Sequence, residues 1–204
     1  MKRQLFALIA CTMLSVAGAY GQNPAVPPKP VIDEPEGLSA AHKYFTDVEL
    51  INQNGQPLRF YSDLIKGRVV VISSFMATCN AACPVKNRNL EKLQEAAGAR
   101  LGKDVLILSI SVDPLTDTPA RLKEYARLYH AKPGWHFLSG KKENVDWALS
   151  KVGQYVPNKE DHVNIVIMGN DATGLWKKAF GLAAIDELIK VFESVLNDKP
   201  AAPN

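Results

Sequence analysis

Two predominantly apolar runs, separated by a helical pattern, place the tightest limit on how this chain can fold. Residues 68–75 (RVVVISSF) and 105–112 (VLILSISV) are continuous and rich in β-branched side chains. Such runs are typical of strands that are buried on both faces of a sheet. Between them, residues 84–97 have apolar residues at helical spacing. The expected inward positions of that helix are Val85, Leu90 and Leu93. A strand, a helix and a second strand in this order predict a parallel βαβ unit.

The rest of the chain supplies the elements that complete a mixed sheet. Residues 47–51 and 57–60 flank an Asn54-Gly55 turn, a pattern that predicts a β-hairpin. Residues 117–119 (DTP) start a helix, since a capping side chain precedes a proline at the first helical position. The further expected elements are a helix to about residue 130, a strand at 136–138, a helix at 141–152, strands at 163–168 and 175–180, and a helix at 183–196. This order predicts an α/β fold of the thioredoxin-like type, a mixed sheet with helices on both faces and an N-terminal β-hairpin.

Composition indicates one folded domain with flanking segments. The 204 residues are 47% hydrophobic and 22% charged, which suffices for one domain with its own core. Three cysteines are too few for a disulfide framework. The expected organisation is a signal peptide at 1–21, a proline-rich tether at 22–40, the thioredoxin-like domain at 41–197 and a disordered tail at 198–204.

The first residues have the pattern of an export signal. A positive start at 2–3 (KR) is followed by an apolar stretch at 5–17 and by small residues at 17–21 that suit cleavage. The apolar stretch is shorter than the roughly 20 residues that span a bilayer. An alternative is a bacterial lipobox at 8–11, which would make Cys11 a lipidated first residue, although the apolar stretch continues past it. Both interpretations predict an exported domain, in the periplasm or facing it, where disulfides can persist.

The charge of the chain argues against a nucleic-acid partner. The formal net charge is +3, and removal of Lys2 and Arg3 with the signal leaves 22 basic and 21 acidic residues. Lysine and arginine form no block, and aromatic residues do not alternate with basic ones. We therefore expect no nucleic-acid binding.

A cysteine pair lies where the central strand gives way to the first long helix. Cys79 and Cys83 are four residues apart, and Pro84 follows as an early helical residue. We expect the two sulfurs to lie on one face of a helical turn, at a helix N-terminus that lowers thiol pKa. A disulfide across so short a loop adds little stability, which favours a reactive pair over a structural one. Thiolates attack disulfides and also bind soft metals, so the pair alone leaves a redox role and a metal site open.

Separated segments of the chain resemble one known family. The segments are FYSDLIKGRVVVISSFMATCNAACP (60–84), SVDPLTDTPARLKEYA (111–126) with PGWHFLSG (133–140), and DHVNIVIMGNDATGLW (161–176). Together they resemble the Sco/SenC family over nearly all of residues 41–197. The resemblance implies a thioredoxin-like fold that binds copper through a CxxxCP pair and a distant histidine. It also implies delivery of copper, or of reducing power, to the binuclear copper centre of cytochrome c oxidase.

Residue by residue, the resemblance implies that Cys79 and Cys83 are thiolate ligands and that His162 is the imidazole ligand. His162 also stands out by position, because it follows a polar loop at 155–161 and starts a strand of the predicted sheet. We expect that strand to be parallel, with its end facing the first helix and the thiols. The other histidines, His42, His130 and His136, are expected to be structural. Many members of the family have a proline where this chain has Asn80, which leaves the ligands intact.

Two thiolates and one imidazole form a soft donor set, and this set favours copper. It suits Cu(I) and can also hold Cu(II). Zinc would usually take a fourth ligand, for which Asp161 or water remains an alternative. The turn-forming role of Asp113 explains this residue adequately, and a place at the border of the site, at the end of a strand, remains an alternative.

The sequence thus predicts an exported copper-binding protein that acts as a copper chaperone, a thiol reductant or both in the assembly of the cytochrome c oxidase copper centre. The expected partner is a copper-acceptor protein, namely a cytochrome c oxidase subunit. The alternative is a general periplasmic thiol–disulfide oxidoreductase without a metal role, in which Cys79 attacks and Cys83 completes the redox dithiol. A thiol peroxidase is disfavoured, because Met76 stands where threonine or serine is expected before a peroxidatic cysteine.

Overall fold

A mixed sheet organises residues 26–33 and 35–200, the part of the chain that the computed structural model describes. Its seven strands lie in the order β2-β1-β5-β4-β3-β6-β7. The strands are β1 (Glu49–Asn52), β2 (Pro57–Arg59), β3 (Val69–Phe75), β4 (Val105–Ser111), β5 (Trp135–Ser139), β6 (Ile165–Asn170) and β7 (Leu175–Phe180). β3, β4 and β5 are parallel, β6 and β7 are antiparallel to their neighbours, and β1 and β2 form the predicted hairpin.

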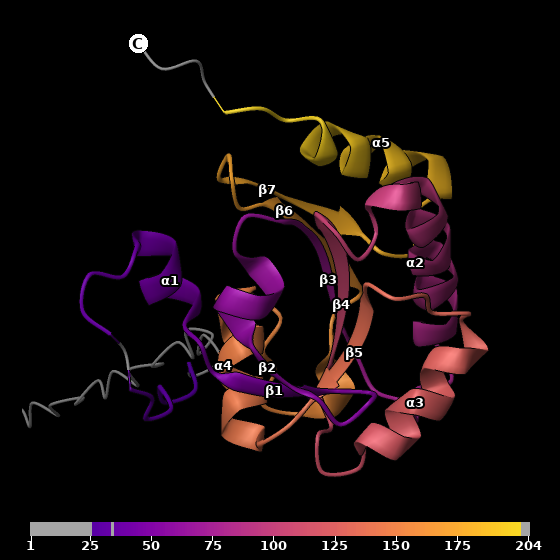
Figure 1. The fold of residues 1–204 in the computed structure, drawn as a ribbon. Coiled ribbons are helices and arrows are strands. Elements are labelled where there is room, and N and C mark those ends of the chain that lie inside the picture. The colour runs from indigo at the N-terminus through magenta and orange to yellow at the C-terminus, as the bar shows by residue number, and fades with distance from the viewer. Residues whose placement is uncertain (1–25, 34, 201–204) are drawn as a thin grey trace, which may run out of the picture.

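Helices cover both faces of this sheet. They are α1 (Ala40–Phe45), α2 (Cys83–Ala97), α3 (Pro119–Leu128), α4 (Lys142–Lys151) and α5 (Ile185–Leu196), with short turns of helix at Phe60–Ile65 (η1), Gly98–Arg100 (η2) and Lys159–Asp161 (η3). Figure 1 shows α2, α3 and α5 on one side of the sheet, and α4 with α1 on the other. The predicted thioredoxin-like α/β fold is therefore confirmed, whereas α1 and η1 were not predicted.

The core follows the apolar runs of the sequence. β3 and β4 are buried along their whole length, because each has a strand on both sides and helices above and below. On α2, the predicted inward positions Leu90 and Leu93 are fully buried. The prediction for Val85 is wrong, since this side chain is 52% exposed. Lys86 is buried in its place, because residues 86, 90 and 93 form one stripe at helical spacing.

The strand after His162 runs in the opposite direction from the one predicted. β6 is antiparallel to β3, with Ser73 opposite Val166 and Val69 opposite Asn170. The chain leaves the C-terminal end of β5 through α4, whose ten residues carry it about 15 Å away. The segment 152–164 is long enough to bring the chain back to that same edge of the sheet. β6 consequently starts beside the C-terminal end of β3, where α2 also begins.

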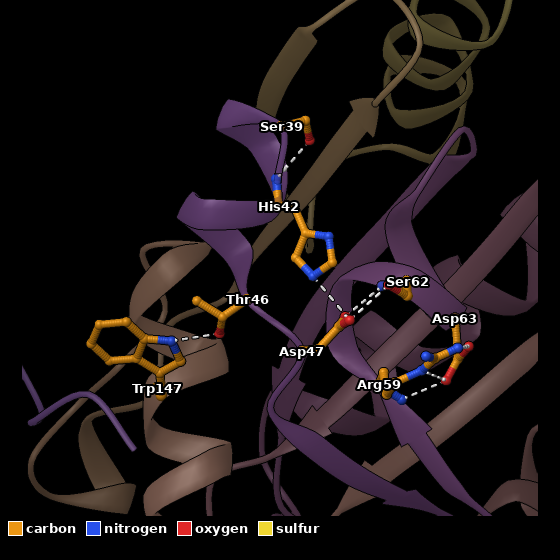
Figure 2. Close-up of polar contacts among 8 residues, drawn as sticks. All are labelled: Ser39, His42, Thr46, Asp47, Arg59, Ser62, Asp63 and Trp147. Atoms are coloured by element: carbon orange, nitrogen blue, oxygen red, sulfur yellow. Dashed lines mark hydrogen bonds and ion pairs between the residues drawn. The ribbon is translucent and has the colours of Figure 1, made fainter. Parts of the chain in front are cut away.

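A polar cluster fastens the N-terminal helix to the domain (Figure 2). His42 Nε2 lies 2.9 Å from Asp47 Oδ2, and the backbone N–H and hydroxyl of Ser62 donate to the same carboxylate. The indole N–H of Trp147 on α4 donates to the Thr46 hydroxyl at 2.9 Å. The contact with Asp47 occupies the imidazole of His42, as expected of a structural histidine.

The predictions for the two ends of the chain fall largely outside the described residues. The signal peptide at 1–21, Cys11 and residues 201–204 all lie outside them. In the described part of the tether, Pro27 is buried and Ile32 packs against the core. None of the helices within residues 26–33 and 35–200 combines the length and the apolar character needed to cross a membrane.

Candidate metal centre

The cysteine loop connects the end of β3 to the start of α2. Cys83 is the first residue of α2, and the following Pro84 occupies the first turn, as predicted. Cys79 lies in the preceding loop, where its backbone N–H donates to the Met76 carbonyl at 3.1 Å. The expectation that both cysteines share one helical turn is therefore wrong. The chain instead turns at Met76 so that the Cys79 sulfur lies over the helix N-terminus.

The two thiols differ in acidity because the backbone N–H groups at the helix N-terminus donate hydrogen bonds to the sulfur of Cys79. Burial opposes ionisation of Cys79, but hydrogen bonds from the backbone N–H groups of Cys83, Ala81 and Ala82 and from the Cys83 thiol outweigh it, so the pKa of Cys79 is lowered. No side chain caps this helix end, which leaves those N–H groups free for the sulfur. Burial raises the pKa of Cys83 to about 11, even though the charge of Lys86 lowers it. Cys79 is thus the more readily formed thiolate.

His162 meets this pair from the other side. Its Nε2 atom lies 3.3 Å from the Cys83 sulfur, and its Nδ1 atom lies 2.8 Å from the Lys159 carbonyl oxygen. A carbonyl only accepts hydrogen bonds, so Nδ1 carries the proton and the Nε2 lone pair faces the sulfur. This is how proteins fix a metal-binding histidine, with the second nitrogen held by a backbone carbonyl. The imidazole belongs to the turn after η3, three residues before β6.

The structure thus brings together the three residues singled out by sequence. The two sulfurs and a ring nitrogen of His162 all lie within 4.8 Å of one another. Metal–sulfur and metal–nitrogen bonds of about 2.0–2.3 Å place three trigonal donors on the order of 4 Å apart. The donor atoms therefore need to move by less than about 1 Å to bind one ion. The arrangement fits a soft metal ion, and it equally permits a dithiol that cycles through a disulfide.

An ion pair fixes the loop that carries His162. Lys159 Nζ lies 2.7 Å from Asp113 Oδ2 at the end of β4. Burial opposes ionisation of Asp113, but Lys159 and Thr116 outweigh it and lower the pKa of this carboxyl. Asp113 touches no predicted ligand, and it reaches the site only through Lys159. The same Lys159 residue holds the imidazole through its carbonyl, so one residue joins β4 to His162.

A buried carboxylate fixes the other loop. Asp117 Oδ2 accepts hydrogen bonds from the Ala77 backbone N–H at 3.1 Å and from the Ser111 hydroxyl at 2.6 Å. Burial raises the pKa of Asp117. The predicted capping side chain before Pro119 is that of Thr118, whose hydroxyl accepts from the Arg121 backbone N–H. Asp117 therefore anchors the start of the cysteine loop rather than the helix.

Lys86 is the residue of this region that sequence reasoning missed. It is fully buried, and its ammonium donates hydrogen bonds to the carbonyls of Ser74 and Val163. Burial lowers the pKa of Lys86, while the neighbouring sulfurs of Cys83 and Cys79 raise it. The signal was present in the sequence, because Lys86 shares a helical stripe with Leu90 and Leu93. Because a charged residue is ordinarily expected at the surface, the pattern was not interpreted as burial of Lys86.

The remaining histidines are occupied elsewhere. His130 Nδ1 lies 2.7 Å from a carboxylate oxygen of Glu91, and His136 lies on β5, where burial lowers its pKa. Met76 is part of the hydrophobic core. The predicted structural role of His130 and His136 agrees with these positions.

Comparisons with known proteins agree on one family. The SCO1/SenC family model matches residues 36–195. An SCO2-like protein of Rickettsia conorii is 33% identical over 165 residues, which cover 76% of this chain and 78% of the relative. A protein of Stutzerimonas stutzeri, named as a candidate copper-binding protein, is 28% identical over 78% of this chain and 74% of its own length.

The fold has matches among solved structures. The structure of BsSco is described as that of a member of the Sco family of cytochrome c oxidase assembly proteins, with a disulfide switch. It superposes with a TM-score of 0.60 at 26% identity and covers 76% of this chain and 94% of BsSco.

Proposed function

Because the chain belongs to the SCO1/SenC family, we propose that it binds one copper ion through Cys79, Cys83 and His162 and delivers it to an acceptor protein. The observation that carries this proposal is the convergence of two sulfurs and an imidazole nitrogen within 4.8 Å. We further propose that the acceptor is a subunit of cytochrome c oxidase, by analogy with the family to which BsSco belongs.

Copper suits this donor set better than zinc does. Within the described residues, the cluster contains these three donors and no fourth histidine, cysteine or carboxylate. Thiolate and imidazole ligands select Cu(I), which accepts low coordination numbers, whereas structural zinc sites are almost always four-coordinate. The name of the Stutzerimonas relative points to the same metal.

The accessibility of the donors supports transfer rather than storage. Cys79 is 9% exposed and has exposed neighbours in Thr78 and Asn80, whereas Cys83 is fully buried. An acceptor thiol can therefore approach the Cys79 side of the site first. Replacement of Cys79 and His162 by acceptor ligands would then release the ion stepwise, with Cys83 as the last protein ligand.

The dithiol also supports a second candidate function, the reduction of an acceptor disulfide. The acidity of Cys79 favours it as the attacking thiolate: it forms a mixed disulfide and expels one acceptor thiolate, which takes up a proton. Cys83, once deprotonated, attacks the Cys79 sulfur, and the second acceptor thiolate leaves and is protonated. Two electrons pass from the dithiol to the acceptor, and a Cys79–Cys83 disulfide remains. The general periplasmic oxidoreductase without a metal role uses this same step.

Export is part of the proposal. A signal peptide at 1–21, or lipidation of Cys11, would place the domain on the periplasmic side of the membrane, where its acceptor lies. The tether at 22–40 would then separate the domain at 41–197 from the membrane surface.

A transfer experiment distinguishes the two functions. Copper-loaded mature protein is mixed with the purified soluble copper domain of an oxidase subunit, and copper in each protein is measured after separation. In parallel, reduction of the acceptor disulfide is followed without copper. We expect His162→Ala to abolish copper delivery and to retain disulfide reduction, while His130→Ala retains both. Copper delivery that is unaffected by His162→Ala would contradict the proposal. A Cys79→Ser variant that loses disulfide reduction but still delivers copper would favour the oxidoreductase.

A further inference from the structure

A buried lysine lies directly behind the two cysteines. Lys86 follows Cys83 by three residues on α2, a spacing that places both on one face of the helix. The side chain of Lys86 is 0% exposed. Its stem lies against Gly181, where even a Cβ atom would come within 3.0 Å of the Cγ and Cδ atoms of Lys86. The absence of a side chain at Gly181 thus leaves room for the Lys86 stem.

Within residues 26–33 and 35–200, the Lys86 charge has no carboxylate partner. Its ammonium donates to the Ser74 carbonyl and, at 3.4 Å, to the Val163 carbonyl. Among the ion pairs of the described residues, none includes Lys86. A buried charge without a counter-ion is costly, so it is retained only where an opposite charge offsets that cost. The groups that can carry this opposite charge are the Cys83 and Cys79 sulfurs, whose fields act on Lys86.

We propose that Lys86 is the built-in counter-charge of the metal-loaded site and that it favours Cu(I) over Cu(II). This inference rests on the proposed copper function. Two thiolates, a neutral imidazole and Cu(I) together carry one negative charge, which the Lys86 ammonium neutralises. With Cu(II) the complex of the same ligands has no net charge. The Lys86 ammonium is then a buried positive charge that no opposite charge neutralises. Lys86 is therefore a positioning and tuning residue that touches no metal.

Lys86 also contacts the segment that carries His162, and this second role must be separated from its charge. Val163, whose carbonyl it binds, directly follows His162. An uncharged amide can also donate hydrogen bonds to carbonyls. Lys86→Gln keeps a donor and removes the charge, whereas Lys86→Met removes both.

The test compares the affinities of these variants for the two oxidation states. Reduced protein is titrated with Cu(I) against a chromophoric Cu(I) chelator, and Cu(II) affinity is measured against a Cu(II) chelator. Lys92→Met is the matched control, since Lys92 lies on the same helix with its side chain 57% exposed. We expect Cu(I) binding by both Lys86 variants to weaken by about 10–100-fold, the usual effect of losing a group behind a metal ligand. Cu(II) affinity should fall far less, and Lys92→Met should match the wild type in both measurements.

Each other outcome has a distinct meaning. Equal Cu(I) affinity in Lys86→Gln and wild type would overturn the inference and leave the proposed function intact. Equal losses for Cu(I) and Cu(II) would also overturn it, because they would reduce Lys86 to a structural tether. Failure of the wild type to bind Cu(I) would remove the proposed function itself. Thermal unfolding verifies that the variants fold, and Lys86→Gln carries the test if Lys86→Met does not fold.

Discussion

The Nε2 atom of His162 lies 3.3 Å from the sulfur of Cys83, although 79 residues separate them in the chain. The antiparallel entry of β6 beside β3 makes this contact, because it returns the chain to the edge of the sheet at which α2 begins. The contact adds a third donor atom to the two sulfurs, all within 4.8 Å of one another. The following predictions test how the surrounding residues hold it.

The two cysteines should differ in reactivity. Burial opposes ionisation of Cys79, but the backbone N–H groups of the loop outweigh it and lower the pKa of Cys79. Burial raises the pKa of Cys83 to about 11. Because the thiolate is the reactive form, short exposure of the reduced, copper-free protein to iodoacetamide between about pH 6 and 10 should modify mainly Cys79. Peptide mass spectrometry measures the ratio. Preferential labelling of Cys83 in the folded protein would contradict this account, and the two thiols should react equally in denaturant.

The Asp113–Lys159 ion pair should support metal binding without contacting the metal. Loss of the pair in Lys159→Met frees the turn that orients the imidazole, so Cu(I) affinity should fall by roughly 10-fold. Asp113→Asn should have a similar effect near neutral pH. Because the pKa of Asp113 is lowered in the folded protein, the pair is intact near neutral pH and is lost only as pH falls through that lowered value. Lys92→Met is again the control. Unchanged affinity in both variants would mean that the turn needs no such support.

Asp117 should stabilise the fold more than Asp146 does, an acidic residue in an i,i+4 ion pair on α4 whose side chain is 15% exposed. Asp117→Ala leaves the Ala77 N–H and the Ser111 hydroxyl without their buried acceptor, at a cost of roughly 1–3 kcal/mol. Asp146→Ala, which breaks an ion pair with Lys142 on α4, should cost less than about 1 kcal/mol. Urea denaturation measures the loss of stability in both variants.

The pKa of Asp117 is raised by burial, so the wild type should gain stability as pH falls through that raised pKa. The Asp117→Asn variant should lack this increase in stability at lower pH, because asparagine does not ionise.

The register of α2 can be tested through its apolar residues. Leu90→Ala should destabilise the protein by about 2–5 kcal/mol, because it opens a cavity in the core. Val85→Ala, at an exposed position, should change the free energy of unfolding by less than about 0.5 kcal/mol. Similar losses from the two substitutions would mean that Val85 faces inward, and Lys86 would then not reach the cysteines.

Sequence patterns identify most of this fold and much of its site. The runs that form β3 and β4 could be identified because short runs rich in β-branched residues are typical of strands covered on both faces. The three segments resembling Sco/SenC indicate the family, which the comparisons confirm. The direction of β6 was wrong, because strand patterns carry no information on orientation. Lys86 and the Asp113–Lys159 pair were missed because burial of a charge, and contacts between residues 46 positions apart, depend on tertiary packing.

The most direct test of the account is the absorption spectrum of the Cu(II)-loaded protein, recorded beside that of His162→Ala. If Cys79, Cys83 and His162 bind one ion, the wild type should take up one copper per chain and show a Cu(II)–thiolate charge-transfer band. His162→Ala should lose or strongly shift that band. An identical band and equal copper content in the variant would contradict a role of His162 in the site and would leave only a reactive dithiol.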